Sequence, residues 1–348
     1  MPPKAKADGA ALKALKQDLK ANTLGCLYVF HGEESYLRDY YLGEMKKKLL
    51  PAGMEEFNFH TLPGKEFDVK KLQELVDCLP MMSRRTLIVV SDYDLYKGDK
   101  EGLIRVLSDL PAYVCLVFVY DILEYKADAR TKLAGLLKEK GRVVAFNRQG
   151  QNDLVDWISR RFRALDHDIG TEDAKYLMFL CGDLMNGLIS EIGKIGAYAK
   201  GHRVTRADID AVATPQLDAV VFQMTDAIAA GNFDRAASVL GDLFHMQEAP
   251  IKLLAVLGKQ LRQLYSARLC LEGRKSAAYL MELWGMRNSY PAEKLMNAAR
   301  RFSLPWCRRA VVRCGEVDLA MKSTGAGGEE LLVAFLMELA APAGAHAE

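Results

Sequence analysis

The first residues that could do chemistry lie where an apolar segment, Cys26–Phe30, meets an amphipathic one, Tyr36–Leu50. A strand that runs through a glycine turn into a helix is the frame of a phosphate-binding loop, G-x-x-x-x-G-K-[S/T]. That loop needs glycines for backbone N–H contacts, a lysine for phosphate and a hydroxyl for Mg²⁺. Here the junction is His31-Gly32-Glu33-Glu34-Ser35, which has one glycine and no lysine, and whose two carboxylates repel a triphosphate. We predict a degenerate phosphate-binding loop that binds no nucleotide, at Gly32, Glu33, Glu34 and Ser35, with Ser35 as the helix N-cap.

The end of a second apolar segment supports the same prediction. Thr86–Val90 leads into Ser91-Asp92-Tyr93-Asp94. In an ATPase, an aspartate at this strand end helps to hold the metal, and a glutamate after it activates the attacking water. Tyr93 replaces that glutamate, so a solvated strand end is favoured over a metal site at Asp92. Two separate parts of an ATPase are therefore missing, and we expect no catalytic residue, no cofactor and no metal.

Histidines and cysteines offer little alternative chemistry. His31 could serve as a base, but no serine or cysteine nucleophile motif lies near it in sequence, so a polar loop residue is favoured. The seven cysteines contain no C-x-x-C pair, and the six histidines show no H-x₃₋₅-H spacing. This pattern indicates reduced core cysteines in a cytosol and no metal site. No apolar run approaches the ~20 residues of a membrane span.

The net charge of +2 excludes a dominating basic footprint, so any DNA contact would be local. Three arginine groups are the candidates. We interpret all of them as solvated helix faces, with DNA contact as the alternative. They are Arg160, Arg161 and Arg163; Arg300 and Arg301; and Arg308, Arg309 and Arg313.

The segment from Cys78 to Arg85, CLPMMSRR, is the best candidate for binding a partner. Asp68 should cap an amphipathic helix that Pro80 ends. Two adjacent methionines then precede a charged turn, and the pattern alone does not decide whether they fold into the core or project. Methionine is flexible and polarizable, so a projecting Leu79-Pro80-Met81-Met82 tip, flanked by Cys78, would suit a partner's apolar pocket.

Helices and strands must position these residues, and in the first part of the chain they alternate. Apolar, β-branched runs predict strands fully buried in a sheet. Because helical patterns separate them, the sheet should be parallel with helices on both faces. The predicted strands are Cys26–Phe30, Thr86–Val90, Tyr113–Tyr120 and Arg142–Phe146.

The pattern changes at the polar run Asn147–Asn152, after which we predict helices only. Four of them should form a small unit, and a larger bundle should follow from Ala219 to Leu339, with short polar or Gly/Pro connections. Thr205 is the expected N-cap of the fourth. The four helices are Leu154–Leu165, Glu172–Leu180, Leu184–Lys200 and Arg206–Val212.

Together these segments resemble the delta subunit of the bacterial DNA polymerase III clamp loader, over nearly the whole chain. Each matching piece is short, but the pieces occur in order across three predicted domains. They are Leu27–Arg38, Leu79–Val90, Glu248-Ala249-Pro250, Gln260–Leu264, and Glu316-Val317-Asp318 followed by Lys322-Ser323.

The resemblance implies an α/β plus all-α architecture with three domains. The first is an AAA+-like parallel αβα sheet domain with a degenerate P-loop, residues 1–148. A small helical lid domain, 149–213, and a C-terminal helical collar domain, 214–342, follow, with a tail at 343–348. It also implies that the tip formed by Leu79, Pro80, Met81 and Met82, flanked by Cys78, binds and helps to open the ring-shaped beta sliding clamp, without ATP hydrolysis by this chain.

The implied partners are the beta sliding clamp, the gamma/tau and delta-prime subunits, joined through the collar in a hetero-pentamer, and primed DNA in the assembled complex. The implied location is the bacterial cytoplasm, at the replisome, with no membrane contact. Many relatives have two aromatic residues where this chain has Met81 and Met82. Two alternative functions stay open: a stand-alone P-loop-like ATPase, and a DNA-binding scaffold that uses the arginine faces.

Overall fold

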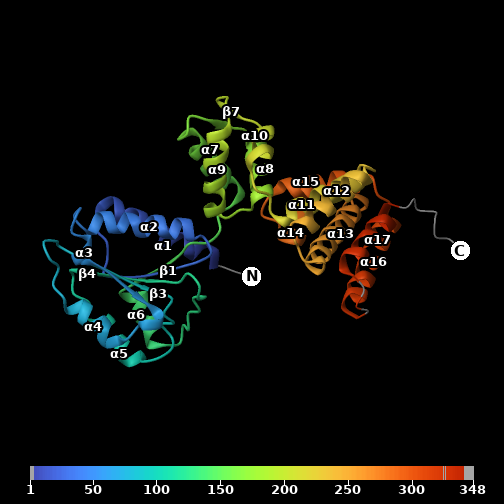
Figure 1. Ribbon diagram of the computed structural model, residues 1–348. Coiled ribbons are helices and arrows are strands. Elements are labelled where there is room, and N and C mark those ends of the chain that lie inside the picture. Colours follow the sequence, from blue (N-terminus) through green and yellow to red (C-terminus); the bar gives the residue numbers. More distant parts are fainter. Residues whose placement is uncertain (1–3, 324, 326, 341–348) are drawn as a thin grey trace. The chain divides into compact units, whose positions relative to one another are not determined.

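The computed structural model describes residues 4–323, 325 and 327–340 (Figure 1). Its contacts divide the chain into two compact units. The first comprises residues 1–149 with 184–186, and the second comprises residues 150–183 with 187–348. No helix among the described residues has the length and apolar character that a membrane crossing requires.

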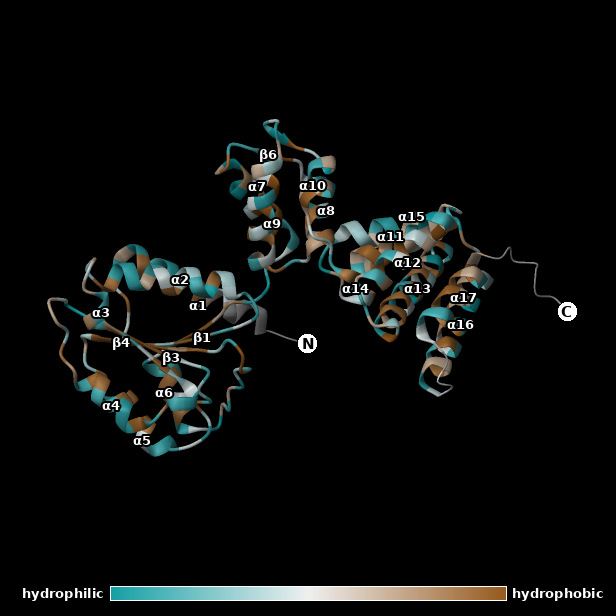
Figure 2. Ribbon diagram, in the orientation of Figure 1, coloured by the Kyte–Doolittle hydropathy of each residue, from teal (hydrophilic) through white to brown (hydrophobic). Residues whose placement is uncertain are grey.

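A five-stranded parallel sheet forms the centre of the first unit, with the strand order β2-β3-β4-β1-β5. Its inner strands are β1 (Leu27–His31), β3 (Thr86–Ser91) and β4 (Val114–Val119), and β5 (Arg142–Ala145) is an edge strand. The strands are hydrophobic along most of their length (Figure 2). Because helices cover both faces, continuous apolar runs are buried on either side. The predicted parallel sheet is confirmed.

Helices cover the two faces in separate groups. The strand alternation sends Tyr28 and Phe30 to the face with α1 and α2, while Val29 joins the core under the other group. The first group is α1 (Lys4–Ala21) and α2 (Ser35–Leu49), and the second is α4 (Val69–Asp77), α5 (Lys100–Ser108) and α6 (Lys132–Glu139).

The edge strand β2 (Phe59–Pro63) was not among the predicted strands. Only Leu62 of its five residues is buried, and it ends in a proline, so it lacks the continuous apolar run of the inner strands. It pairs with β3 on one side only. The four-residue helix α3 (Glu55–Asn58) precedes it and a 3₁₀ turn (Gly64–Glu66) follows it.

The second unit is mostly helical, as predicted, but it also contains two short strands. β6 (Asp168–Ile169) and β7 (Arg203–Val204) pair in parallel, and two-residue strands are too short to leave a periodic signal. Thr205 caps α10 in a capping box with Asp208, which confirms the predicted N-cap. The four helices are α7 (Gln151–Arg163), α8 (Thr171–Cys181), α9 (Met185–Tyr198) and α10 (Arg206–Val212).

Seven further helices form the bundle at the C-terminal end of the described chain. The long helix α13 lies at its centre, in contact with α11, α15 and α16, and contributes Leu253, Leu257 and Leu261 to the core. The helices are α11 (Leu217–Ala229), α12 (Phe233–His245), α13 (Pro250–Glu272), α14 (Ala277–Trp284), α15 (Ser289–Ala299), α16 (Leu304–Ser323) and α17 (Gly328–Ala340).

Polar and aromatic contacts join the four-helix part of the second unit to its bundle. Asn288 donates from its amide to the carbonyl of Lys175 (2.8 Å). The Arg206 guanidinium lies over the rings of Tyr176 and Tyr290, 4.2 and 5.4 Å from their centroids. The division into domains at 148/149 and 213/214 stays a prediction, and the expected tail at 343–348 lies outside the described residues.

Candidate functional sites: a filled nucleotide crevice and an exposed apolar tip

The degenerate phosphate-binding loop is short and closed against β5. β1 ends at His31 and α2 begins at Ser35, so only three residues connect them, fewer than the G-x-x-x-x-G spacing of the working motif requires. The Glu34 N–H donates to the Phe146 carbonyl (2.8 Å). Gly32 has φ +115°, and a Cβ there would lie 2.4 Å from the Phe146 oxygen. Gly32 is therefore required by this close approach of two backbones.

The side chains of this loop bind protein groups. Glu33 forms an ion pair with Arg148 (2.6 Å), and Ser35 Oγ accepts a hydrogen bond from the Asn186 amide (2.5 Å). Glu34 is fully buried and accepts from the backbone N–H of Met185 at 3.3 and 3.4 Å. The predicted N-cap was wrong by one residue: Glu34 occupies the cap position of α2, without a side-chain cap hydrogen bond, and Ser35 is the first helical residue.

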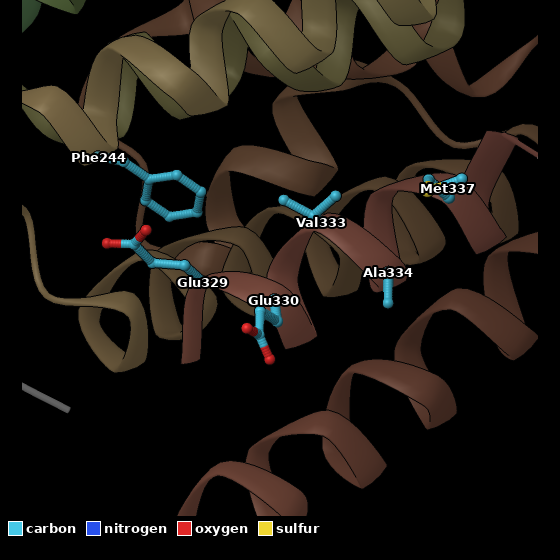
Figure 3. A pocket seen from close by; sticks show the side chains of 6 residues that line it. All are labelled: Phe244, Glu329, Glu330, Val333, Ala334 and Met337. Carbon is cyan, nitrogen blue, oxygen red and sulfur yellow. The ribbon is translucent and has the colours of Figure 1, made fainter. Parts of the chain in front are cut away.

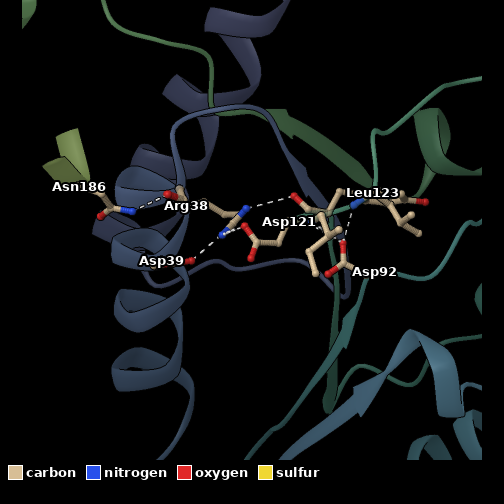
Figure 4. A network of polar contacts seen from close by, with 9 residues as sticks. Arg38, Asp39, Asp92, Asp121, Leu123 and Asn186 are labelled. Atoms are coloured by element: carbon tan, nitrogen blue, oxygen red, sulfur yellow. Dashed lines mark hydrogen bonds and ion pairs between the residues drawn. The ribbon is translucent and has the colours of Figure 1, made fainter. Parts of the chain in front are cut away.

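A buried arginine lies beside the loop and contacts the segment that follows β4 (Figure 4). Arg38 on α2 is 3% exposed. Its guanidinium donates to the Tyr120 carbonyl (3.1 Å) and pairs with Asp121 (2.6 Å) and Asp39 (3.2 Å). Sequence reasoning could not assign these roles to Arg38 and Asp121, because the Arg38 contacts with Tyr120 and Asp121 join residues more than 80 positions apart.

Asp92 holds the loop that follows β4. Its Oδ1 accepts backbone hydrogen bonds from three consecutive residues, Asp121 (2.9 Å), Ile122 (2.8 Å) and Leu123 (3.0 Å). Burial acts to raise the pKa of Asp92. The hydrogen bonds from Leu123, Asp121 and Ile122 and the charge of Arg38 outweigh this effect, so the pKa lies below its ordinary value. The expected solvated strand end is thus a structural anchor.

These contacts occupy the crevice where parallel αβα sheets bind ligands. Such sheets place ligands at the carboxyl ends of two neighbouring strands whose connections leave in opposite directions. Here β1 connects toward β2 at one edge and β4 connects to β5 at the other, so the crevice lies between β1 and β4. The network of Arg38, Asp92 and Asp121 lies there. Tyr93, in place of the missing glutamate, stacks on Phe67 with ring centroids 3.7 Å apart.

His31 packs its ring 4.8 Å from the ring of Tyr125, in agreement with a loop-edge position. Within the described residues, no group of three or more His, Cys, Asp or Glu side chains could hold a metal ion. All seven cysteines are free thiols, and five of them are buried.

The candidate binding tip lies between α4 and β3, at the amino end of β3, whereas the crevice lies at the carboxyl ends of the strands. Asp68 caps α4 as predicted, with a hydrogen bond from the Lys70 N–H (2.8 Å). Leu79, Met81 and Met82 are 77%, 54% and 79% exposed, and Cys78 beside them is also exposed. The methionines therefore do not fold into the core, which decides the question that the sequence left open.

Hydrogen bonds from neighbouring residues fix the backbone of the tip. Asn58, fully buried at the end of α3, donates to the Met81 carbonyl (2.9 Å) and accepts from the Met81 N–H (2.8 Å). Its amide also donates to the Met54 carbonyl (2.9 Å). Met82 has φ 51°, a left-handed conformation uncommon for a residue with a side chain. Asn58 is a positioning residue that the sequence analysis missed.

Arg85 fixes the other end of the tip. Its guanidinium donates to the carbonyls of Leu24 (2.5 Å), Gly25 (2.8 Å) and Val114 (2.9 Å). Ser83 Oγ donates to the Arg85 carbonyl (2.9 Å). The tip is thus held at Met81 and again at Arg85, while its apolar side chains face solvent.

The arginine groups are only partly free. Arg163 pairs with Asp168 (3.2 Å), and Arg313 pairs with Glu338 (2.5 Å) and Glu316 (2.8 Å). The Arg161 guanidinium lies 5.6 Å from the Trp157 ring centroid. Arg160, Arg308 and Arg309 are exposed. These contacts favour the interpretation as ordinary helix faces.

The chain is a parallel αβα sheet module followed by helical regions, and comparison with known proteins gives its family. A sequence model described as "DNA polymerase III, delta subunit" matches residues 28–147, and one described as "DNA polymerase III delta subunit, C-terminal domain" matches residues 218–339. The chain belongs to the DNA polymerase III delta subunit family.

Individual relatives agree over nearly the full length. The chain is 22% identical to DNA polymerase III subunit delta of Bacillus subtilis, over 93% of this chain and 95% of the relative. It is also 22% identical to the probable delta subunit of Aquifex aeolicus, over 89% and 90%. The solved Bacillus subtilis DNA clamp loader delta protein superposes with a TM-score of 0.56 at 20% identity, over 94% of this chain and 98% of that one. This superposition confirms the fold class.

Proposed function

We propose that this chain is the clamp-loader subunit that binds the beta sliding clamp and helps to open it. The observation that supports this proposal most strongly is the tip Leu79-Pro80-Met81-Met82. Its apolar side chains are exposed, while Asn58 and Arg85 fix its backbone. A fixed apolar plug loses little conformational entropy when it enters a pocket, so more of its burial becomes affinity. Isolated exposed residues are common, but adjacent large ones at a fixed tip favour a partner.

We propose further that the chain does not hydrolyse ATP. The support is the three-residue loop after β1 and the crevice filled by Arg38, Asp92 and Asp121. ATP hydrolysis would then belong to the gamma/tau subunits. The chain would join them and delta-prime through its C-terminal bundle, in the bacterial cytoplasm, with primed DNA bound by the assembled complex.

The tip is tested with Met81→Ala/Met82→Ala and the organism's own clamp, by calorimetry on the isolated chain. Truncating two anchors of a binding hot spot should weaken binding by about 2–4 kcal/mol. Ile122→Ala is the matched control, since Ile122 is 86% exposed in the same unit but follows the carboxyl end of β4, away from the tip at the amino end of β3. Equal clamp affinity for the double variant and the wild type would refute the assignment.

Titration of the isolated chain with ATP and Mg²⁺ tests the second proposal. We expect no heat of binding, whereas a stand-alone ATPase would show micromolar affinity. A DNA-binding scaffold would show affinity for DNA by the lone chain that falls steeply with salt.

A further inference from the structure

Helices α1 and α2 lie side by side on one face of the sheet (Figure 1), and their side chains line a hollow of about 370 Å³. The volume is in the range of cavities that seat a bound group. We call this hollow the α1–α2 pocket. Its apolar part consists of Leu19, Tyr40 and Tyr41, and its charged part consists of Glu44 and three lysines, Lys16, Lys20 and Lys48.

The α1–α2 pocket concentrates positive charge in a chain whose net charge is only +2. Lys16, Lys20 and Lys48 are exposed, and within the described part of the chain none of them has an ion-pair or hydrogen-bond partner. The carboxylate of Glu44 pairs with Lys47, outside the pocket lining (2.9 Å), so its charge is already compensated. Three positive charges therefore remain available to an anionic ligand.

An exposed ring lies among these lysines. Tyr40 is 48% exposed and meets Tyr41 edge to face, with ring centroids 5.1 Å apart. The helix dipole favours lysines such as Lys20 and Lys48 in the last turns of α1 and α2, but it does not account for an exposed ring beside them. A half-exposed ring next to unpaired cations suits a ligand that has both an apolar group and negative charges.

Another hollow, over α17, has the opposite charge (Figure 3). It measures about 450 Å³, and Phe244, Val333 and Met337 form its apolar part. Its charged side chains are those of Glu329 and Glu330. An anionic ligand should therefore bind at the α1–α2 pocket and avoid the hollow over α17, which serves as an internal control.

Single-stranded nucleic acid and an acidic peptide are the two anionic ligands to compare. A nucleic-acid strand binds by stacking successive bases on several rings along a groove. In this pocket the second ring is occupied, because Tyr41 stacks on Phe146 (centroids 5.9 Å apart) and the Lys16 ammonium lies 5.8 Å from its centroid. Glu44 would also face the phosphates. One free ring in a short pocket favours the peptide.

We propose that the α1–α2 pocket binds a short acidic peptide segment of a partner protein. One apolar or aromatic side chain of the segment would enter the hollow against Tyr40 and Leu19. Its carboxylates would pair with Lys16, Lys20 and Lys48. This site lies on α1 and α2, apart from the tip between α4 and β3, and it does not depend on the proposed function.

The experiment is fluorescence anisotropy of a labelled peptide, four glutamates followed by leucine and phenylalanine, titrated with the full chain. Lys16→Glu/Lys48→Glu should weaken binding by about tenfold at 0.1 M salt and by less at 0.5 M, because salt screens exposed charges. Lys70→Glu/Lys138→Glu is the matched control, since both lysines are exposed on α4 and α6, which cover the other face of the sheet. Circular dichroism of each variant should match that of the wild type.

Tyr40→Ala tests the apolar part of the pocket and should weaken binding by about fivefold at both salt concentrations. Tyr279→Ala is its control, because Tyr279 is 46% exposed and also lies near a lysine, Lys275, at 5.4 Å. Met337→Ala, in the hollow over α17, should leave peptide binding unchanged.

Three outcomes would overturn the proposal. The first is equal binding of a peptide whose leucine and phenylalanine are replaced by serine, since the lysines would then act only as diffuse charge. The second is tighter binding of single-stranded oligothymidylate with the same losses in the pocket variants. The third is unchanged peptide binding in those variants. Met81→Ala/Met82→Ala should bind the peptide as the wild type does, so this proposal and the proposed function can fail separately.

Discussion

Asp92 holds the loop after β4 through hydrogen bonds from its carboxylate. Removing this side chain should therefore lower the stability of the protein by a measurable amount. Its Oδ1 accepts three backbone hydrogen bonds of 2.8–3.0 Å, from Asp121, Ile122 and Leu123. Hydrogen bonds to a charged group contribute about 1.5–3 kcal/mol each, and partial exposure lets water replace some of this, so about 1 kcal/mol each is reasonable. Asp92 also has φ 53°, a conformation that Asp and Asn tolerate better than Ala, by about 1 kcal/mol. We expect Asp92→Ala to lower the free energy of unfolding by about 3–4 kcal/mol.

Asp92→Asn separates the contribution of the negative charge from those of shape and backbone conformation. Asparagine keeps the shape, tolerates the left-handed conformation and still offers a neutral acceptor. We expect a loss of about 1–2 kcal/mol. The pH dependence has a definite sign. The folded-state pKa of Asp92 lies below its unfolded value of about 3.9, so the extra stability is present above that value and disappears as the pH falls through the folded pKa. The deficit of Asp92→Asn should thus be largest near neutral pH and shrink below about pH 4.

Urea unfolding followed by circular dichroism, with and without Mg²⁺, measures both variants. Asp109→Ala, at an exposed aspartate just after α5, is the control and should stay within about 0.5 kcal/mol of the wild type. The reasoning fails if Asp92→Ala costs under about 0.5 kcal/mol. It also fails if Mg²⁺ stabilises the wild type but not Asp92→Ala, since Asp92 would then be a metal ligand.

Three further predictions concern the loop and the tip. Asn58→Ala should cost about 1–3 kcal/mol and also weaken clamp binding, because Met81 loses both its backbone partners. Asn58→Asp keeps the acceptor but buries a carboxylate against the Met54 and Met81 carbonyls, so it should destabilise the protein at least as much. Gly32→Ala should lower the free energy of unfolding by about 2–4 kcal/mol in thermal unfolding. The control Gly43→Ala, where a Cβ on α2 meets open space, should be neutral or stabilising. A small effect of Gly32→Ala would contradict the close backbone contact at Phe146. Exposed Cys78 should react with a maleimide at pH 7 far faster than Cys115, whose pKa burial raises to about 12, and excess clamp should slow the labelling of Cys78 in mass spectrometry.

The inner strands were predictable because their signal is local. Thr86–Val90 is a continuous apolar run, and such a run is buried wherever it pairs. β2 was not predictable in the same way, since four of its five residues are not buried and the segment becomes a strand only through pairing with β3. The missing lysine and glutamate were visible in the sequence, but the groups that fill the crevice were not.

The tip shows the same limit. Its apolar composition could be read from Leu79-Pro80-Met81-Met82, whereas its exposure and its support could not. Asn58 contacts Met81 across 23 residues, and Arg85 contacts Leu24 across 61. A single asparagine or arginine has no periodicity, so only the folded chain reveals these contacts.

The three-residue connection between β1 and α2 has an evolutionary consequence. A lysine substituted into Gly32–Glu34 would still lack the length of backbone that encloses a phosphate, and Gly32 already lies against Phe146. If the loop binds no nucleotide, as we propose, point substitution alone would not create that activity. It would need an insertion in the loop together with the loss of Arg38 or Asp92 from the crevice, so several coordinated changes separate this loop from a working one.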